Sequence, residues 1–506
     1  MSAEMLVFAS LGPALAAGVA ALILDAFSTR RAALWVAGAG LAASGAVCAW
    51  ATATQPVSSA WSAVRTGGPF AAVAAVTFIT AALAVLGGGS DLSRREGGGT
   101  LAALIAIGAV ASAVMASAQD ITLLLISLET AAACGYGLVS GARTARSDES
   151  AMKYFIQGAI STGFFVLGMA VMVTVFAPHG DLNSIQNMFE KPELFSVAVV
   201  GMVTLVAVLA FKAGVAPFHS WAPDAYETST PEVAAFLSAG PKLAAITALV
   251  VLISLAASRP GADPAGKATQ ALAVIVSLLA VTSIAVGSLV ALRQRSYTRM
   301  LAYAGIAQVG YALVGATVVM SPATAVFFAS TYALASTGTF LAASAFRRAR
   351  PGWDGSIAGL AGMGRTAPVL SASVGVLLIS LAGIPPFLGF WAKLAAFGAA
   401  VLQSTAAFSD GLTTLGWASA VAAAAGIVGS VISLGYYGAV LRALYLLPEP
   451  QQVAETSADP AEAPTAAAGG NTAGIVVVFV ALLVIALGLL PLVRGVGALV
   501  WPFTVR

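Results

Sequence analysis

TLVAVLAFKAGVAPFHSWAPDAYETSTPEVAAFLSAGPKLAAI, residues 204–246, is the stretch that decides how the rest of the chain is interpreted. It begins as an apolar helix that carries Lys212 and then meets Pro217, a residue that a helix interior does not tolerate. A polar stretch follows, and the apolar sequence that resumes carries Lys242. A lysine in hydrocarbon costs roughly 2.5–3.5 kcal/mol on insertion scales. Two lysines beside one interrupted helix therefore indicate half of an ion pathway.

The composition places the whole chain in a membrane. Hydrophobic residues make up 59% of the 506 residues and charged residues only 9%, whereas an average soluble domain carries about 25% charged residues. Apolar runs of about 20 residues recur along the length, as membrane-spanning helices require. Strands of a membrane β-barrel would be roughly 10 residues long with alternating polarity. The sequence therefore predicts an all-α, polytopic membrane protein, and a net charge of +3 does not suggest nucleic acid.

Few residues are suited to hold a metal or a cofactor. The two cysteines, Cys48 and Cys134, are isolated inside apolar runs, and there are only two histidines. The chain has no GxGxxG between a strand and a helix and no P-loop. We therefore expect no metal and no cofactor in this chain, and we assign any redox or nucleotide chemistry to other chains.

The apolar runs give a count of about 14 spans. The first lacks a basic residue before its apolar run, so we interpret it as a retained helix rather than a secretory signal. The runs at 194–224 and 368–401 are too long and too interrupted to be plain spans. The expected spans are roughly 5–27, 32–53, 70–88, 100–118, 120–141, 151–177, 194–224, 231–256, 268–291, 299–320, 323–346, 368–401, 415–442 and 474–493.

The basic residues predict how the chain is oriented. When the connections are assigned alternately to two sides, 14 of the 24 Lys and Arg residues fall on one side, 6 on the other and 4 inside spans. Cytoplasmic loops carry the excess of basic residues, so we expect both termini to face outward. The segment 446–473 is rich in Pro, Ala and Gly and is expected to be a flexible cytoplasmic linker.

A second interrupted helix occurs at 380–396, SLAGIPPFLGFWAKLAA. Pro385 and Pro386 break the apolar run, and Lys393 follows close behind. Two interrupted helices at corresponding points of two halves are typical of a transporter site. We therefore take Pro217, Pro385 and Pro386 as the residues that break the helices.

This pattern divides the chain into five parts. Three helices (1–99) precede a first repeat (100–256) and a second repeat (268–442), and a linker (443–473) leads to a last helix (474–506). Each repeat holds about five spans. Because that number is odd, the second repeat is expected to be inverted relative to the first.

Five ionisable residues inside the expected spans are candidates for a proton relay: Glu129, Lys153, Lys212, Lys242 and Lys393. Lysine suits a relay because arginine stays protonated, and a nearby carboxylate changes the proton affinity of a buried lysine. Movement of Glu129 relative to Lys212 would therefore change the proton affinity of Lys212, and a chain of such lysines connected by water can then pass protons along. Structural explanations stay open, since Lys153 lies close enough to a helix end to snorkel to the interface, and burial as ion-pair partners is an alternative role for Lys242 and Glu129.

Other polar residues lie near the breaks. The auxiliary candidates are His219, Tyr303, Gln308 and Tyr311. His219 is equally suited to relay protons or to be a satisfied histidine near the cytoplasmic face. Three acids, Asp224, Glu227 and Glu232, are expected to lie near a cytoplasmic loop and to be only solvated.

Three long motifs resemble one family. FKAGVAPFHSWAPDAYETSTPEVAAFLSAGPKLAA (211–245), RMLAYAGIAQVGY (299–311) and GIPPFLGFWAKLAAF (383–397) are similar to the antiporter-like membrane subunits of respiratory complex I, which are related to Mrp-type cation/proton antiporter subunits. The resemblance covers most of the chain and is strongest from about 120 to 400. MKYFIQGAISTGFFVLGMAV (152–171) further resembles the sixth span of the N-type subunits, which have 14 spans and lack the lateral helix of the L type.

The resemblance implies a role for each ionisable candidate. Glu129 corresponds to the glutamate of the fifth helix, Lys212 to the pump lysine of the seventh and Lys242 to the relay lysine of the eighth. Lys393 corresponds to the lysine of the twelfth helix that leads toward the periplasm, where the M-type subunits typically carry a glutamate. Lys153 corresponds to a lysine of the sixth helix. One departure is Gln308, where many members have a histidine, so a protonatable step there is not implied.

The resemblance implies a proton-translocating subunit of NADH:quinone oxidoreductase, an H⁺-translocating enzyme complex, in the bacterial inner membrane. Its partners would be other membrane-arm subunits (M, K and J), with FMN, Fe–S clusters, NADH and quinone bound in partner chains. Two alternatives stay open. One is an Mrp-like cation/proton antiporter subunit without redox coupling, and the other is a membrane scaffold whose lysines only pair structurally.

Overall fold

A computed structural model describes residues 1–175, 180–182, 185, 195–257, 267–317, 323–449 and 471–494. Most of the expected linker at 446–473 lies outside the described residues. The helices are α1 (Ala3–Ala26), α2 (Arg30–Thr54), α3 (Gly68–Gly87), α4 (Gly89–Leu92), α5 (Gly98–Ser117), α6 (Ile121–Ser140), α7 (Ala145–Val175), α8 (Phe195–Ala213), α9 (Trp221–Thr228), α10 (Pro231–Ala257), α11 (Lys267–Ala291), α12 (Tyr297–Ala316), α13 (Ala323–Ala349), the 3₁₀ helix η3 (Ala358–Leu360), α14 (Met363–Thr366), α15 (Pro368–Ala382), α16 (Leu388–Ser409), α17 (Thr413–Tyr445) and α18 (Thr472–Arg494).

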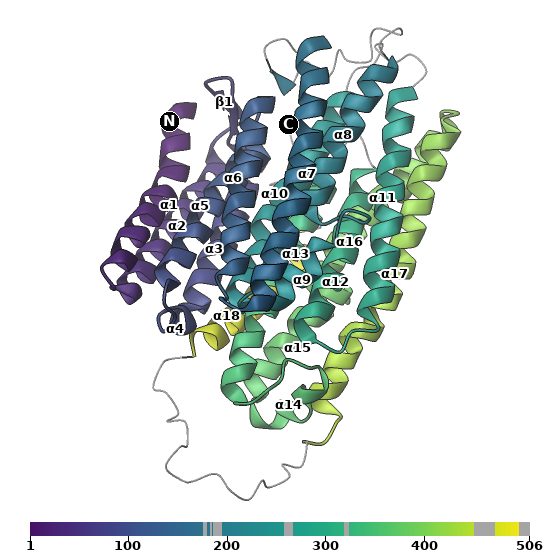
Figure 1. Cartoon of the computed structure of the whole chain (residues 1–506). Helices are drawn as coiled ribbons and strands as arrows, with labels where there is room; N and C mark the ends of the chain where they lie inside the picture. Colours follow the sequence, from purple (N-terminus) through teal and green to yellow (C-terminus); the bar gives the residue numbers. More distant parts are fainter. Residues whose placement is uncertain are drawn as a thin grey trace, which may run out of the picture.

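The architecture is an all-α bundle, as the composition predicted (Figure 1). Within the described residues the only sheet is a short antiparallel hairpin of β1 (Ser58–Ala60) and β2 (Val64–Thr66), in which Ser58 pairs with Thr66. It lies at the end of the bundle where α1 begins (Figure 1).

Twelve of the described helices are long and apolar enough to cross a membrane, or thirteen if the pair Ala358–Thr366 and Pro368–Ala382, bent by 120°, forms one span. The sequence predicted about 14 spans. The expected spans that are not among the twelve are α12 and the interrupted pair α15 and α16. The helix α12 carries an arginine, a glutamine and several tyrosines, and α15 has only 15 residues, so neither is apolar over a full membrane thickness.

Two helices form the centre of the bundle. Every residue at 323–346 of α13 and every residue at 231–250 of α10 is buried. These two helices pack against each other along their lengths. A helix that is apolar on every side must be enclosed by others, and α3, α5, α12, α16 and α18 also pack around this pair.

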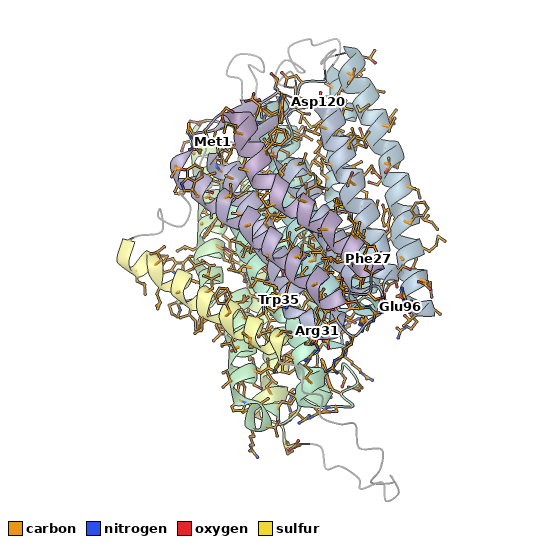
Figure 2. The ribbon with its side chains drawn as sticks, turned by 90° about the vertical axis from the view of Figure 1, so that its left-hand side faces the viewer. Met1, Phe27, Arg31, Trp35, Glu96 and Asp120 are labelled. Atoms are coloured by element: carbon orange, nitrogen blue, oxygen red, sulfur yellow. The ribbon has the colours of Figure 1, made fainter. Side chains whose placement is uncertain are left out.

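The outer helices keep apolar faces on the surface. Large hydrophobic side chains of α7 and α17, such as Phe155, Phe164 and Trp417, are exposed. In a membrane, such faces contact lipid or neighbouring subunits. The helix α18 crosses the side of the bundle obliquely (Figure 2).

The first helix runs from the end of the bundle where Met1 lies toward the opposite end (Figure 2). Met1 and Asp120 lie toward one end, and Phe27, Arg31 and Glu96 lie toward the opposite end (Figure 2). The short helices α4 and α14 also lie at this second end (Figure 1). We call it the arginine-rich end, because the connections there carry most of the arginines counted on the cytoplasmic side of the sequence.

Candidate functional site

The first interrupted helix ends at a glycine. The helix α8 stops at Ala213, and Gly214 adopts the left-handed conformation with φ +74°. The amide of Gly214 donates to the carbonyl of Phe211 at 3.0 Å, and the amide of Val215 donates to the carbonyl of Ala210 at 2.8 Å. This pair of bonds is a Schellman motif, which satisfies the last carbonyls of a helix and favours glycine.

The second interrupted helix ends in the same way. The helix α15 stops at Ala382, and Gly383 has φ +86°. The amide of Gly383 donates to the carbonyl of Ser380 at 2.9 Å, and the amide of Ile384 donates to the carbonyl of Ile379 at 3.2 Å. Both helices therefore end in the same backbone hydrogen-bond pattern, a Schellman motif with a left-handed glycine.

The prolines are not the points at which the helices end, as the sequence analysis had taken them to be. Pro217 comes three residues after Gly214, and Pro386 comes three residues after Gly383. Each helix has already turned away at its glycine, and the prolines then prevent it from resuming. The Ala216–Pro217 and Pro385–Pro386 bonds are both cis.

Lys393 binds the end of the second interrupted helix. It lies in α16 with 6% of its surface exposed, and its Nζ donates to the carbonyl of Ala382 at 2.8 Å. The same nitrogen lies 4.7 Å from the centre of the Tyr311 ring. The partial negative charge at the helix end and the face of the ring both stabilise an ammonium group.

Lys242 extends from α10 toward the first break. It is 1% exposed, and a methyl group placed on Gly214 would lie 3.8 Å from its Nζ. The nitrogen faces two aromatic rings, those of Tyr226 at 5.4 Å and Tyr332 at 5.6 Å. Among the described residues it has no hydrogen-bond partner. The amine therefore lies in an aromatic cage, beside the broken end of α8.

A proline directly precedes Lys242 inside the helix. Pro241 has no amide hydrogen, so it leaves the carbonyl of Leu237, four residues earlier, without its helical donor. The hydroxyl of Tyr226 donates to this carbonyl at 3.1 Å. Tyr226 therefore repairs the helix and also forms one wall around Lys242.

Lys212 lies in the last turn of α8 and is 2% exposed. Its Nζ lies 3.3 Å from the hydroxyl of Tyr154. The ring of Tyr154 stacks on Trp221 with centroids 4.1 Å apart and planes 5° apart, and the indole of Trp221 donates to the carbonyl of Phe211 at 3.0 Å. Trp221 thus holds Tyr154, the hydrogen-bonding neighbour of Lys212, against the end of α8.

Glu129 is a half-buried residue of α6. It accepts a hydrogen bond of 2.6 Å from the hydroxyl of Thr162 in α7. Glu129 is the acid that contributes to the electrostatic environment of Lys212. Within the described part of the chain, however, no direct ion pair joins the two residues. Any influence of Glu129 on Lys212 is therefore electrostatic and not a direct contact.

Lys153 lies apart from the three buried lysines. Its side chain is 49% exposed and pairs with Glu149 at 2.7 Å and with Asp224 at 3.4 Å. Asp224 also binds Arg299, which in turn binds Glu227. These ion pairs tie α7, α9 and α12 together at the surface. The relay role of Lys153 stays a prediction, whereas Asp224 and Glu227, expected to be only solvated, are in fact paired.

Three auxiliary candidates surround the second break and the surface network. Gln308 of α12 is buried and donates to the carbonyl of Leu381 at 2.9 Å and to the hydroxyl of Tyr437 at 3.2 Å. Tyr311 of the same helix contacts Lys393, and Tyr303 lies under Arg299. Gln308 therefore links α12 to the last turn of α15.

His219 lies in the first break, half-buried between α8 and α9. Its carbonyl accepts a bond of 3.0 Å from the amide of Ala222. No hydrogen bond or ion pair of the described residues joins its imidazole to a lysine. Its part in a relay stays a prediction.

The position of Glu232 differs from the one expected from the sequence. It was expected near a cytoplasmic loop and only solvated, but it is 1% exposed in the first turn of α10. The turn lies under α4, and Gly88 leaves the space that the carboxylate stem fills. Its place at the head of an otherwise apolar helix was the one signal in the sequence.

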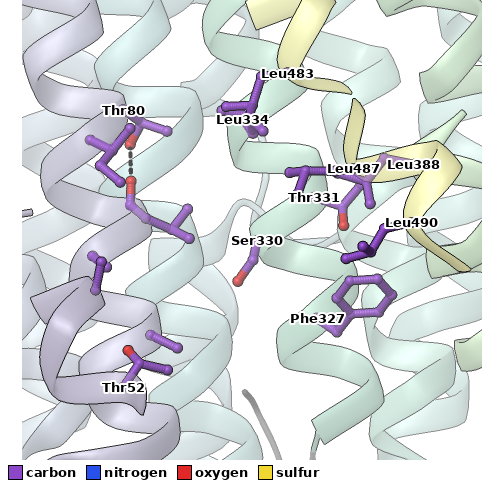
Figure 3. A pocket seen from close by; sticks show the side chains of 15 residues that line it. Thr52, Thr80, Phe327, Ser330, Thr331, Leu334, Leu388, Leu483, Leu487 and Leu490 are labelled. Atoms are coloured by element: carbon purple, nitrogen blue, oxygen red, sulfur yellow. Dashed lines mark hydrogen bonds between the residues drawn. The ribbon is translucent and has the colours of Figure 1, made fainter. Parts of the chain in front are cut away.

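One cavity, lined mainly by apolar side chains, does not touch these residues. It has a volume of about 450 Å³ and lies between α3, α13 and α18 (Figure 3). Leucines and alanines dominate its lining, and its few hydroxyls include Thr80, which bonds within its own helix. No titratable side chain lines it, so it offers no steps for a proton. Among the described residues, no group of His, Cys, Asp and Glu is placed to hold a metal ion.

Residues 118–415 match a family model described as NADH:quinone oxidoreductase/Mrp antiporter, transmembrane. This match covers more than half of the chain and includes both breaks and all the candidate lysines. The chain belongs to the NADH:quinone oxidoreductase/Mrp antiporter family.

One relative in this family is NADH-quinone oxidoreductase subunit N 2 of Sorangium cellulosum, which is 34% identical over 370 residues, 71% of this chain and 69% of that protein. Among solved structures, a chain of respiratory complex I from Thermus thermophilus with bound aureothin is similar with a TM-score of 0.73 and 26% identity, covering 96% of this chain and 98% of that one. A chain of the Mrp complex from Dietzia sp. has a TM-score of 0.77 at 18% identity, covering 99% and 97%. The fold is thus common to both branches of the family.

Proposed function

We propose that this chain is a proton-translocating membrane-arm subunit of an NADH:quinone oxidoreductase. The observation that carries the proposal is the placement of buried lysines at two helix breaks of equal geometry. Lys212 and Lys242 lie at the first break and Lys393 at the second. The resemblance to NADH-quinone oxidoreductase subunit N relatives supports the redox-driven branch of the family over the antiporter branch.

The proposed mechanism moves protons and leaves the helices in place. Glu129 changes the proton affinity of Lys212 when its distance or charge changes, since a nearby carboxylate favours the charged form of a lysine. A proton released by Lys212 passes by water to Lys242 and then across the centre of the bundle to Lys393. Gln308, held between α15 and α17, is suited to order water on the last part of this route.

The chemistry that drives these steps belongs to partner chains. We propose that NADH, FMN, Fe–S clusters and quinone are bound in other subunits, and that this chain is the translocase part of the enzyme with no redox site of its own. Subunits M, K and J are the proposed neighbours. The exposed first break supports such neighbours, because Pro217 and Phe218 lie on the surface and irregular backbone at membrane depth requires cover by protein.

The chain is proposed to lie in the bacterial inner membrane with both termini outward. The arginine-rich end, with α4 and α14, would face the cytoplasm. This orientation is supported by the excess of basic residues on that side of the sequence.

The test is proton pumping by the assembled complex in liposomes, measured with a pH-sensitive dye during NADH oxidation. Glu129→Gln and Lys212→Met should each lower the number of protons moved per NADH while the complex still assembles. Arg31→Gln, a change at an exposed arginine, is the matched surface control and should pump normally. Unchanged pumping in both Glu129→Gln and Lys212→Met would overturn the relay.

The main alternative is an Mrp-like cation/proton antiporter subunit without redox coupling, which the shared fold allows. Affinity purification from native membranes separates the two. Flavin-containing and Fe–S-containing subunits that co-purify support the oxidoreductase, whereas membrane subunits alone support the antiporter. A third outcome, tolerance of replacement at every buried lysine, would favour a structural scaffold.

A further inference from the structure

Glu232 is a buried acid that the lysine relay does not use. It lies in the first turn of α10, the helix that carries Lys242, and is 1% exposed. Its own amide and the hydroxyl of Thr230 are neighbouring donors, but neither forms a hydrogen bond of normal geometry to the carboxylate, and no other described residue does. An ionised carboxylate without a partner carries a large desolvation cost. This arrangement therefore suits a carboxyl group that holds a proton.

The charged groups that face Glu232 come from the arginine-rich end. They are Asp91 of α4 and Arg95, which follows it. Asp91 is in turn bound by the guanidinium of Arg348 and by the hydroxyl of Ser344, both on α13. Glu232 is thus enclosed beneath a charged cluster, at the point where α4, α10 and α13 meet.

The position of Glu232 at the beginning of a helix also stabilises its ionised form. The first turn of a helix carries partial positive charge, which stabilises a nearby carboxylate. Glu232 occupies such a turn, and Arg95 is close enough to interact. Both the protonated and the ionised forms therefore have a physical means of stabilisation, as a group that takes up and releases protons requires.

Hydroxyl groups line the interface from this cluster toward Lys242. On α13, Ser336 lies one turn from Tyr332 on the same side of the helix, and Ser344 lies two turns further toward the arginine-rich end. On α10, the hydroxyl of Ser238 donates to that of Ser336 at 3.3 Å. Ser238 precedes Lys242 by one helical turn.

The hydroxyl row ends at the lysine. A methyl group placed on Gly305 of α12 would lie 2.5 Å from the hydroxyl of Tyr332 and 3.5 Å from Nζ of Lys242. The Tyr332 hydroxyl has no hydrogen-bond partner among the described residues, and its side-chain neighbour is Ser336. Over the ten residues from Glu232 to Lys242, about 15 Å of helix, polar groups thus recur from the cluster to the amine.

We infer that Glu232 is a proton-binding residue that takes up protons at the arginine-rich end and passes them between α10 and α13 to Lys242. The inference rests on the proposed function. In the transfer, the O–H bond of the carboxyl breaks and an N–H bond forms on the Lys242 amine. Each hydroxyl between them accepts one proton and donates another, with water as the connecting carrier, and the carboxylate is protonated again from the aqueous side.

The test compares Glu232→Gln with Lys242→Met in the assembled, liposome-reconstituted complex. Glutamine keeps the shape of the side chain, so it fits beside Gly88, but it cannot release a proton. Protons moved per NADH should fall in Glu232→Gln, by no more than the factor seen in Lys242→Met, because Lys212 also supplies protons to Lys242 in the proposed relay. Glu232→Asp should restore a measurable part of the loss. The infrared band of a protonated carboxyl in apolar surroundings should also disappear in Glu232→Gln.

The outcomes separate this inference from the proposed function. Normal pumping in Glu232→Gln with reduced pumping in Lys242→Met overturns the inference and leaves the relay intact. Normal pumping in both overturns the relay itself. If Glu232→Gln fails to assemble, Ser336→Ala decides, since loss of one hydroxyl should slow pumping without disturbing the packing, and an unchanged rate there overturns the inference.

Discussion

The Nζ atom of Lys393 donates a hydrogen bond of 2.8 Å to the carbonyl oxygen of Ala382, the last residue of α15. The final carbonyls of a helix have no intrahelical partner and carry partial negative charge. The side chain of α16 therefore completes the end of α15. One contact thus joins the two halves of an interrupted helix and places a titratable amine at the interruption.

Replacement of Lys393 should separate its structural part from its proposed proton-carrying part. Lys393→Met leaves the carbonyl of Ala382 without this donor, which should cost about 1–3 kcal/mol of stability and abolish proton movement through this subunit. Lys393→Arg keeps a donor and a charge, but arginine does not release its proton. Thermal unfolding and proton pumping of the reconstituted complex are the two measurements. Normal pumping by Lys393→Arg would contradict a role in proton transfer.

Gly214→Ala should strain the first break. Its φ of +74° is unfavourable for a residue with a Cβ atom, at about 1–2 kcal/mol. The nearest heavy atom to the new methyl group would lie 3.8 Å away, so backbone strain alone is measured. The expected result is a lower midpoint of thermal unfolding of the purified complex.

The matched control for this glycine is Gly398→Ala in α16, where a methyl group would meet nothing within 4 Å. Alanine in a helix interior is more favourable than glycine by roughly 0.5–1 kcal/mol, so this variant should unfold at the same or a higher temperature. Equal losses in Gly214→Ala and Gly398→Ala would show that the left-handed conformation is not what the position requires.

Tyr226→Phe should weaken α10 beside Lys242. Removal of the hydroxyl leaves the carbonyl of Leu237 without a donor, and a buried acceptor left unsatisfied costs about 1–3 kcal/mol. The double variant Tyr226→Phe/Pro241→Ala returns an amide hydrogen to the helix at the right position and should recover part of the thermal stability. Tyr445→Phe, at an exposed end of α17, should have little effect. Absence of recovery in the double variant would argue against a repaired helix.

The sequence predicted the main features of the fold because they depend on composition and on strong local rules. Long apolar runs required membrane helices. The cost of a charge in hydrocarbon required Lys212, Lys242 and Lys393 to point inward, and all three are buried. The two interrupted helices were visible because proline and glycine gather in the middle of otherwise apolar runs.

The sequence did not reveal which side of each helix faces the centre. Lys153 lies eight residues after the start of α7 and Glu232 lies in the first turn of α10, yet Lys153 is half-exposed and paired while Glu232 is buried beside Gly88. The difference depends on elements distant in the chain, such as the glycine at position 88 and the turn that follows it. A pattern along one helix does not contain that information.

The prolines lie within both breaks, but the helices end before they reach them. Prolines attract notice because they cannot continue a helix, but each helix here had already ended at a glycine in the left-handed region. The Schellman bonds that close the ends run between backbone atoms. Sequence alone showed the glycines without showing their conformation.

Each interrupted helix is closed by bonds within its own backbone, and this has a consequence for how the subunit works. The Schellman bonds that close each break join backbone atoms only, so they form whether a neighbouring lysine is charged or neutral. The backbone of the two breaks can therefore keep its conformation through a cycle in which the lysines gain and lose protons. A transport cycle built on the proposed relay would then require rearrangement of water and side chains, and not the slower unfolding and refolding of helices.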